Sequence, residues 1–318
     1  MNMPLPISIV IPTCGRSSLL ARTLHSLASC ERPDNLRRVV VVENGARGDA
    51  ASIIKTFTGQ LPVSTEYVAS PNKSRALNRV LERTPDELLL FFDDDVRILP
   101  RTLAVYAAAA NDRVSGFWGG RCRVDYEEEP VAWLKSYLPP SATGWSLGET
   151  ACRLTKPNAL GFNWAAFSRD LRQVGAFNED RGPGTFARGQ ESEMQERLLR
   201  AGIEGEYLPN AIVYHYVPKT RCSEEWALER SRQTARACGV NVARKILIKR
   251  LRHDVMSAGK ILVYNALLNC FHPALSPSRR FHYQYWREFS IGIREGIRRG
   301  QPDPMFSRPP QPATSSST

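Results

Sequence analysis

Short apolar runs alternate with amphipathic stretches over the first hundred positions of the chain. Three runs contain continuous apolar segments rich in branched or aromatic side chains: "ISIVI" (7–11), "RRVVVVENG" (37–45) and "ELLLFF" (87–92). A continuous apolar segment of this length is typical of a strand that is covered on both faces. We therefore expect three buried strands in this part of the chain.

Amphipathic helices are predicted between these strands. Leu20, Leu24 and Leu27 recur at helical spacing after the first strand, and Ser17 is available as an N-terminal cap. A second helical pattern covers residues 72–83. Alternation of strands and helices favours right-handed βαβ crossovers. The fold class predicted is therefore α/β, with a mostly parallel central sheet flanked by helices.

The remaining sequence is predicted to contain loops, further elements and a helical extension. Residues 100–160 read as irregular loops, because they hold a Pro-Pro pair and several glycines and tryptophans. Beyond them the pattern predicts a strand in "GFNWAAFSRD" (161–170), a helix in "ESEMQERLLRAG" (191–202) and a strand in "GEYLPNAIVYHYV" (205–217). We expect three parts: a globular domain over 1–220, a basic helical region over 221–300 and a disordered Pro/Ser-rich tail over 301–318.

The charge of the chain implies an anionic partner. The formal net charge is +11 and the pI is near 9.5, and the net positive charge is concentrated between Arg221 and Gly300. Basic and apolar residues share helical turns in "ARKILIKRLRH" (243–253) and "IGIREGIRRG" (291–300). Two readings stay open for this region: cations that face water, or a surface that makes peripheral contact with an anionic membrane. Nucleic acid is not expected, because no recognition motif of the usual kinds occurs.

The sequence also bears on location and redox state. It contains no run of 18 apolar residues and no signal-peptide pattern, so we expect a cytoplasmic protein, with the inner face of the membrane as a second location. The seven cysteines are scattered without a C-x-x-C pair, and their odd number argues against a disulfide framework. We expect reduced thiols, mostly in the core.

Polar residues follow all three buried strands. Thr13 follows the first, Glu43 and Asn44 follow the second, and Asp93, Asp94 and Asp95 follow the third. The carboxyl ends of parallel strands meet at one edge of a sheet, where ligands of such folds bind. The sequence therefore predicts one site built from three separate segments.

Three adjacent carboxylates repel one another unless a cation balances their charge. A divalent ion does so, and the hard oxygen ligands suit Mg²⁺ or Mn²⁺, which often complete their coordination with substrate phosphates. The alternative is a solvated turn whose aspartates cap the next helix. The position of "DDD" behind a buried strand favours the metal–phosphate site.

Seven segments in order and spacing resemble the family 2 glycosyltransferases of the GT-A fold. The resemblance covers roughly residues 6–220, and it rests on "SIVIPTCGR", "VVVVENGA", "NKSRALNRVLE", "LLLFFDDDV", "GFNWAAFSRDLRQVGAFNED", "GQESEMQERLLRAG" and "AIVYHY". It implies an inverting, metal-dependent enzyme that moves a sugar from a UDP-, GDP- or dTDP-type donor to an acceptor hydroxyl. The acceptor would be a saccharide or a lipid-linked glycan, as in the synthesis of cell-envelope polysaccharides or glycoconjugates.

The resemblance also assigns roles to residues. Asp95 matches the metal ligand of the family's D-x-D motif, and His215 matches a histidine that closes the metal or diphosphate site. Glu43 stands where aspartate is commoner. Positions on the donor and acceptor sugar side are Asn163, Trp164 and Glu193. The residues expected to bind the nucleotide are Pro12, Thr13, Arg16, Glu43, Arg75, Asn78, Asp93 and Asp94.

An inverting transfer needs a carboxylate that takes the proton of the acceptor hydroxyl. Family members carry a Glu-Asp pair before a helix, and Gln190-Glu191 stands in its place here, so Glu191 is the expected base. Glu193 competes with it, but two helical positions differ by about 200° and cannot both face one site. In the alternative without a catalytic role, both glutamates are acidic residues that are stabilised by the N-terminal end of the helix dipole.

Two other activities and a non-catalytic role agree less well with the sequence. A sugar-phosphate nucleotidyltransferase would need a glycine-rich, basic loop after the first strand, and "PTCGRSS" has one glycine and one arginine. A dinucleotide oxidoreductase is disfavoured, because no G-x-G-x-x-G follows "ISIVI". A non-catalytic relative held at a membrane would be expected to lack the aspartates or the base. Asp93, Asp95 and Glu191 are all present.

Overall fold

The computed structural model describes residues 5–271 and 274–300. These residues form two compact units, one up to Ala227 and one from Leu228. The tail over 301–318, which is predicted to be disordered, lies outside the described residues. Within the described ranges, no helix is both long enough and apolar enough to cross a bilayer.

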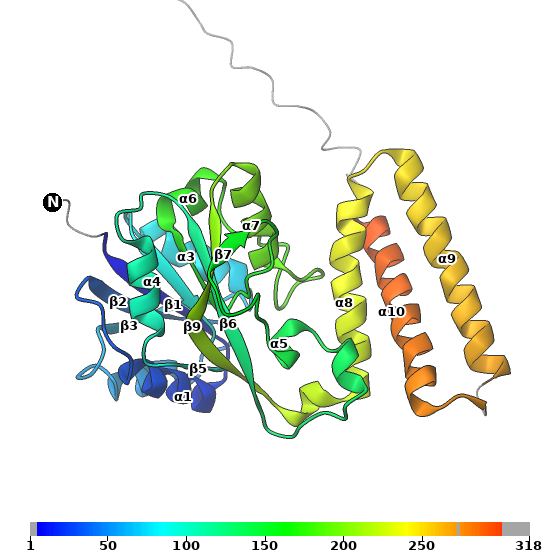
Figure 1. Cartoon of the computed structure of the whole chain (residues 1–318), viewed down its shortest axis with the longest axis horizontal. Helices are drawn as coiled ribbons and strands as arrows, with labels where there is room; N and C mark the ends of the chain where they lie inside the picture. The colour runs from blue at the N-terminus through cyan, green and yellow to red at the C-terminus, as the bar shows by residue number, and fades with distance from the viewer. Residues whose placement is uncertain (1–4, 272–273, 301–318) are drawn as a thin grey trace, which may run out of the picture. The chain divides into compact units, whose positions relative to one another are not determined.

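The first unit is built on one mixed sheet (Figure 1). Its strands run in the spatial order β3-β2-β1-β4-β8-β6-β9-β5, and β7 pairs with β9 outside this path. The strands are β1 (Ile7–Thr13), β2 (Leu36–Asn44), β3 (Val63–Val68), β4 (Leu88–Phe92), β5 (Val96–Ile98), β6 (Phe117–Tyr126), β7 (Cys152–Leu154), β8 (Asn163–Phe167) and β9 (Gly205–Val217).

Helices join the parallel strands and complete the unit. They are α1 (Ser17–Ala28), α2 (Ala50–Lys55), α3 (Lys73–Arg83), α4 (Thr102–Ala110), α5 (Pro140–Thr143), α6 (Ser168–Gln173) and α7 (Gln190–Arg200), with 3₁₀ turns at Leu134–Tyr137 and Lys219–Cys222. Strands β1, β2, β3 and β4 pair in parallel, while β8 runs antiparallel to both β4 and β6. The predicted α/β fold with a mostly parallel sheet flanked by helices is confirmed.

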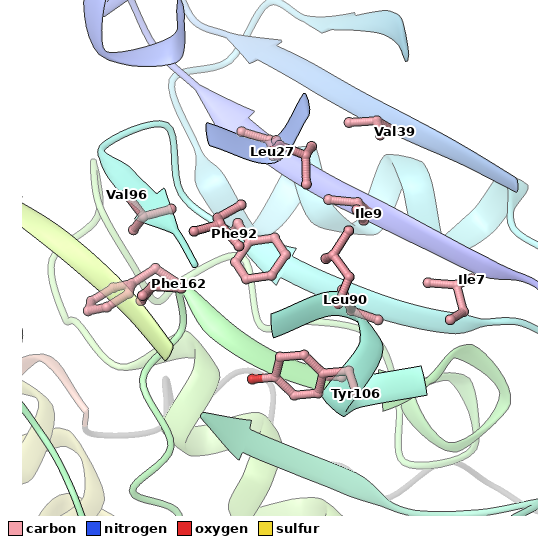
Figure 2. Close-up of a cluster of buried hydrophobic side chains, with 14 of the residues drawn as sticks. Ile7, Ile9, Leu27, Val39, Leu90, Phe92, Val96, Tyr106 and Phe162 are labelled. Carbon is pink, nitrogen blue, oxygen red and sulfur yellow. The ribbon is translucent and has the colours of Figure 1, made fainter. Parts of the chain in front are cut away.

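The central strands have apolar residues on both faces because the sheet has a hydrophobic layer on each side. Along β1, Ile9 packs into one layer and Val10 into the other. The same alternation occurs along β4, where Leu90 and Phe92 join Ile9 and Phe91 joins Val10. Figure 2 shows the first of these layers. Burial on both faces explains why these strands appear in the sequence as unbroken apolar runs.

Local details differ from the sequence expectations at two helix starts. Ser17 is the first residue of α1 and not its cap; Arg16 occupies the cap position, without a side-chain cap hydrogen bond. The cap at α3 is Asn72, whose side chain accepts a hydrogen bond from the backbone nitrogen of Arg75 at 3.0 Å. Position 16 is thereby free to direct its guanidinium elsewhere.

The second unit is a bundle of long helices. It contains α8 (Glu224–Ala243) from Leu228 onward, α9 (Leu247–Cys270) and α10 (Pro277–Arg299). A Cβ at Gly239, Gly292 or Gly296 would overlap a backbone carbonyl of the facing helix, so α8 and α10 pack backbone to backbone. Figure 1 shows α10 between α8 and α9.

The cysteines are less buried than expected. All seven are free, as predicted, but within the described residues only Cys122 is buried. Cys14, Cys152, Cys238 and Cys270 are exposed, so the expectation that most lie in the core is wrong. Scattered cysteines carry no periodicity that would have placed them on one face of an element.

Candidate functional site

The three polar strand ends meet at one edge of the sheet. The side-chain amide of Asn44, at the end of β2, donates to the carbonyl oxygen of Thr13 at 2.9 Å. The hydroxyl of Thr13 in turn donates to Asp94 Oδ2 at 2.6 Å, which joins the end of β1 to the turn after β4. These hydrogen bonds confirm the sequence prediction that the three segments lie together.

Asp94 is the innermost of the three aspartates. Its side chain is fully buried, and Arg16 forms an ion pair with it while the Arg16 Nε donates to Oδ2 at 3.2 Å. Burial raises the pKa of Asp94 to about 6, against the opposing effect of Arg16. We expected Asp94 to contact a nucleotide, but its oxygens face Thr13 and Arg16. In this arrangement Asp94 positions Arg16, and a direct contact of Asp94 with a nucleotide stays a prediction.

Asp95 lies between three cationic or basic side chains. Its Oδ2 is 2.6 Å from Arg16 Nη1 and 3.5 Å from Arg221 Nη1, and its Oδ1 is 3.5 Å from His215 Nε2. Burial by itself raises the pKa of Asp95, but His215 in its protonated form, Arg16 and Arg221 favour the carboxylate and lower the pKa below its ordinary value. Among the described residues, none donates a hydrogen bond to the buried Oδ1.

Strand pairing places His215 beside Asp95. Val96 of β5 is paired with His215 of β9, so the two segments run side by side. The imidazole stacks on the ring of Phe162, with 4.5 Å between ring centroids. Burial lowers the pKa of His215, and Asp95 only partly offsets this. The ring is therefore neutral at pH 7, and a neutral imidazole nitrogen is able to bind a metal ion.

Asp93 forms an ion pair with Lys73, the first residue of α3. Burial disfavours the ammonium charge, yet Asp93 and Glu191 raise the pKa of Lys73 above its ordinary value. Glu191 lies in the first turn of α7. The ammonium of Lys73 thus pairs with Asp93 and is also influenced by the charge of Glu191.

The two glutamates of α7 have different surroundings. A Cβ at Gly161, in the loop before β8, would lie 3.0 Å from the side chain of Glu191, so this glutamate points at that loop. Glu193 instead accepts two hydrogen bonds from Arg197, at 3.0 and 2.9 Å, along its own helix. The geometry favours Glu191 over Glu193 as a reactive group, and it does not bring Glu193 to the aspartates.

Glu43 and Pro12 lie at the same strand ends. Glu43 Oε1 accepts a hydrogen bond from the backbone nitrogen of Gly48 at 2.7 Å, which folds the loop after β2 back on itself. Pro12 is paired in register with Val42, one position before Glu43. Both are close to the edge that holds the aspartates, and Glu43 shapes the loop there.

Arg75 and Asn78 do not join the aspartates. Arg75 Nε is 2.8 Å from a carboxylate oxygen of Glu179, and Asn78 exchanges hydrogen bonds with the backbone of Phe177 at 2.9 and 2.8 Å. Together with Tyr67 they line a separate cavity of about 270 Å³. Both side chains fasten the 177–179 segment to α3, and their nucleotide contacts stay a prediction.

Asn163 and Trp164 are also buried away from any ligand. The Asn163 amide donates to the carbonyl oxygens of Arg121 and Ala211, both at 2.9 Å, and its oxygen accepts from Tyr106. Trp164 exposes 1% of its surface and stacks on Phe91, with 4.8 Å between ring centroids. Neither side chain is exposed in this structure, so the predicted contact of Asn163 and Trp164 with a sugar stays a prediction that their burial does not support. The β8 strand is covered on both faces, and the sequence pattern did not reveal this.

Trp164→Ala is expected to lower the free energy of unfolding by about 3–5 kcal/mol, because it leaves a cavity between Phe91 and Phe177. Denaturant unfolding followed by circular dichroism measures this. Trp286→Ala, in α10, removes a ring that is 38% exposed and should reduce stability less. A stable Trp164→Ala protein that has lost only sugar affinity would contradict the assignment to the core.

Sequence reasoning missed Lys73 and Arg221. Lys73 stands inside "NKSRALN", where the helical pattern indicates which residues face the core but gives no sign that this lysine meets Asp93. Arg221 follows β9 in an isolated 3₁₀ turn. The only available signal was the charge imbalance of three adjacent aspartates, which requires cations nearby.

The donor set suits a hard divalent ion. Asp95 is a carboxylate with one oxygen free of hydrogen bonds, and His215 is neutral beside it. Over the residues that the structure describes, no group of three or more His, Cys, Asp or Glu side chains is arranged to hold a metal. A pair of ligands such as Asp95 and His215 is typical of Mg²⁺ or Mn²⁺ bound by one or two protein ligands together with substrate phosphates.

Comparison with known proteins gives a family match and a set of similar folds. The family model "Glycosyl transferase family 2" matches residues 8–174, more than half of the chain. No curated protein sequence matches the chain. The matched segment contains the described site, apart from α7, His215 and Arg221.

Solved structures share the fold at low sequence identity. The mannosyltransferase PcManGT from Pyrobaculum calidifontis, in complex with GDP-Man and Mn²⁺, is 18% identical with a TM-score of 0.59, over 94% of this chain and 88% of its own. S. aureus TarS 1-349 in complex with UDP-GlcNAc is 16% identical with a TM-score of 0.53, over 93% of each chain. The match to a longer S. aureus TarS structure, also 16% identical with a TM-score of 0.53, spans 92% of this chain and 55% of that one.

Proposed function

The chain belongs to the family 2 glycosyltransferases, and we propose that it transfers a sugar with inversion from a nucleotide-sugar donor to an acceptor hydroxyl. The reaction takes place at the edge of the sheet that carries Asp93, Asp95 and Lys73, with Glu191 opposite. The observation that carries the proposal is Asp95: a buried carboxylate with one free oxygen, beside a neutral His215.

Mn²⁺ or Mg²⁺ is the proposed cofactor, held by Asp95 and His215. When bound, such an ion neutralises the charge that develops on a nucleoside diphosphate leaving group. The GDP-Man and Mn²⁺ complex of the similarly folded mannosyltransferase supports the choice of a divalent ion. Arg16 is about one-third exposed and has a long flexible side chain, so it is able to turn from Asp95 towards a phosphate.

The nucleotide is proposed to lie across the ends of β1 and β2. Thr13 and Pro12 end β1, Glu43 shapes the loop after β2, and Asp93 stands at the exposed side of the aspartate turn with Lys73. Lys73, Arg16 and Arg221 supply the positive charge that a diphosphate requires. UDP, GDP and dTDP donors all fit this charge pattern.

Glu191 is the proposed general base. It takes the proton from the acceptor hydroxyl as the oxygen attacks the anomeric carbon on the face opposite the diphosphate. The charge of Glu191 helps to raise the pKa of Lys73, which supports a position of this carboxylate near the proposed site. The two hydrogen bonds of Glu193 to Arg197 support Glu191 over Glu193 for this role.

The acceptor is proposed to be a saccharide or a lipid-linked glycan in cell-envelope polysaccharide or glycoconjugate synthesis. A lipid-linked acceptor places the enzyme in the cytoplasm at the inner face of a membrane, with peripheral contact through the helices after residue 220. The catalytic domain then reaches slightly beyond the expected residue 220, because Arg221 pairs with Asp95, and the basic helical region follows it.

Nucleotide release tests the proposal. The full chain is incubated with Mn²⁺ and UDP-, GDP- or dTDP-linked sugars, with and without candidate saccharide acceptors. Release of a nucleoside diphosphate from one class of donor is expected, and a product of opposite anomeric configuration by NMR. Release of pyrophosphate from a nucleoside triphosphate and a sugar phosphate would instead identify a nucleotidyltransferase. Retention of anomeric configuration would contradict the role of Glu191.

A further inference from the structure

Helix α9 exposes an apolar face on the side opposite α10. Ile248, Val255 and Leu262 expose 77%, 67% and 71% of their surface. A Cβ at Gly259 would meet nothing within 4 Å, which shows that this face is uncovered at mid-helix. Positions spaced by three and four residues share one face of a helix. The residues of this outer face are Ile248, Leu251, Val255, Gly259, Leu262 and Ala266.

The opposite face of α9 accounts for its packing within the bundle. Asp254 accepts a hydrogen bond from Arg294 of α10 at 2.7 Å, and Tyr264 stacks with Tyr283 of α10. Ser257 and Leu268 are buried on this side. One face of α9 is therefore sufficient to hold it in the bundle, and the outer face needs another explanation.

Three cations border the outer face, Lys249, Arg252 and Lys260. Over residues 5–271 and 274–300, no acidic side chain forms an ion pair with any of them. The acids of this unit are already engaged: Glu229 accepts a hydrogen bond from Gln233, and Asp254, Glu288 and Glu295 pair with arginines.

The second unit accounts for the net charge of the whole chain. From Leu228 to Gly300 the sequence has fifteen Arg and Lys against four Asp and Glu, which equals the formal +11 of the entire chain. An anionic surface is therefore the complementary partner. The apolar stripe adds a second requirement, because leucine, isoleucine and valine gain nothing from contact with a polyanion in water.

From this combination, we infer that the outer face of α9 is an interfacial helix that docks on an anionic lipid bilayer. The stripe enters the boundary between headgroups and acyl chains, while the long stems of Lys249, Arg252 and Lys260 carry their charges back to the lipid phosphates. A second copy of the chain fits less well, since two such faces would bring like charges together without acids to match. The inference rests on the proposed function only for the lipid-linked acceptor.

Vesicle binding of the full chain tests the surface, without donor or metal. Sedimentation with vesicles of phosphatidylcholine and phosphatidylglycerol is compared with phosphatidylcholine alone, and strong preference for the anionic vesicles is expected. Lys249→Gln/Arg252→Gln/Lys260→Gln should weaken binding by about 100-fold, since each cation near such a surface contributes roughly a factor of five. Leu251→Ser/Leu262→Ser should weaken it at least about tenfold.

The matched control removes the same charge elsewhere in the unit. Arg279→Gln/Arg280→Gln/Arg298→Gln alters α10 only and should leave binding within about threefold of the wild type. An equal loss in this control, or equal binding to neutral vesicles, would overturn the assignment. So would a wild-type dimer that dissociates on Leu251→Ser/Leu262→Ser without binding vesicles. Nucleotide binding by Leu251→Ser/Leu262→Ser is measured separately, so a failure of lipid docking is distinguishable from a failure of the proposed activity.

Discussion

Asp95→Asn is expected to lower the turnover number by about 1000-fold or more and to remove its dependence on Mn²⁺. The change replaces a carboxylate that binds a cation with a neutral amide of the same size, so the leaving diphosphate loses the ion that stabilises its charge. His215 alone offers a single ligand. Nucleotide release at saturating donor, over a series of Mn²⁺ concentrations, measures the effect.

A matched aspartate serves as the control for this substitution. Asp86→Asn also removes a carboxylate that pairs with an arginine, Arg172, but at an exposed position in the turn before β4. It should retain turnover within about twofold, because exposed ion pairs contribute little to stability. Turnover of Asp95→Asn within threefold of the wild type would refute the metal assignment.

Glu191→Gln is the second substitution with a large expected effect. It should reduce the turnover number by roughly 100- to 10,000-fold, the range typical of losing a general base. Donor binding and its Mn²⁺ dependence should persist, because Asp95 and His215 are unchanged. The experiment is a comparison of turnover with the affinity for nucleoside diphosphate in the same preparation.

Glu193→Gln is its natural control, two positions along α7. It removes the ion pair with Arg197, an i,i+4 pair of about 0.5 kcal/mol, and should alter turnover by less than about threefold. If Glu193→Gln is the inactive variant and Glu191→Gln the active one, the base is misassigned. If both variants are active, the proton leaves the acceptor by another route.

The fold was largely predictable because its strands are covered on both faces. Strands β1, β2 and β4 have apolar neighbours on both sides of the sheet, and this condition produces continuous apolar sequences. Strand β3 was not predicted, since "VSTEYV" lies at the edge of the sheet and none of its residues is fully buried. A half-exposed edge strand carries too few apolar positions to stand out from a loop.

The place of the site was predictable, but the partners of its side chains were not. The parallel sheet requires that the ends of β1, β2 and β4 meet, and the family match agrees with the enzyme class. Which side chains face the site depends on rotation about helices and on depth in the core. Asn78 and Trp164 had the right neighbours in sequence but point into the protein, whereas Lys73 points at Asp93.

The central claim is that Asp95 holds a divalent ion for a nucleoside diphosphate. A thermal-shift series with UDP, GDP, dTDP and CDP, each with and without Mn²⁺, on the wild type and Asp95→Asn tests it most directly. The account predicts stabilisation by one nucleotide that requires Mn²⁺ and disappears in Asp95→Asn. Stabilisation of equal size without Mn²⁺, or undiminished in Asp95→Asn, would contradict it.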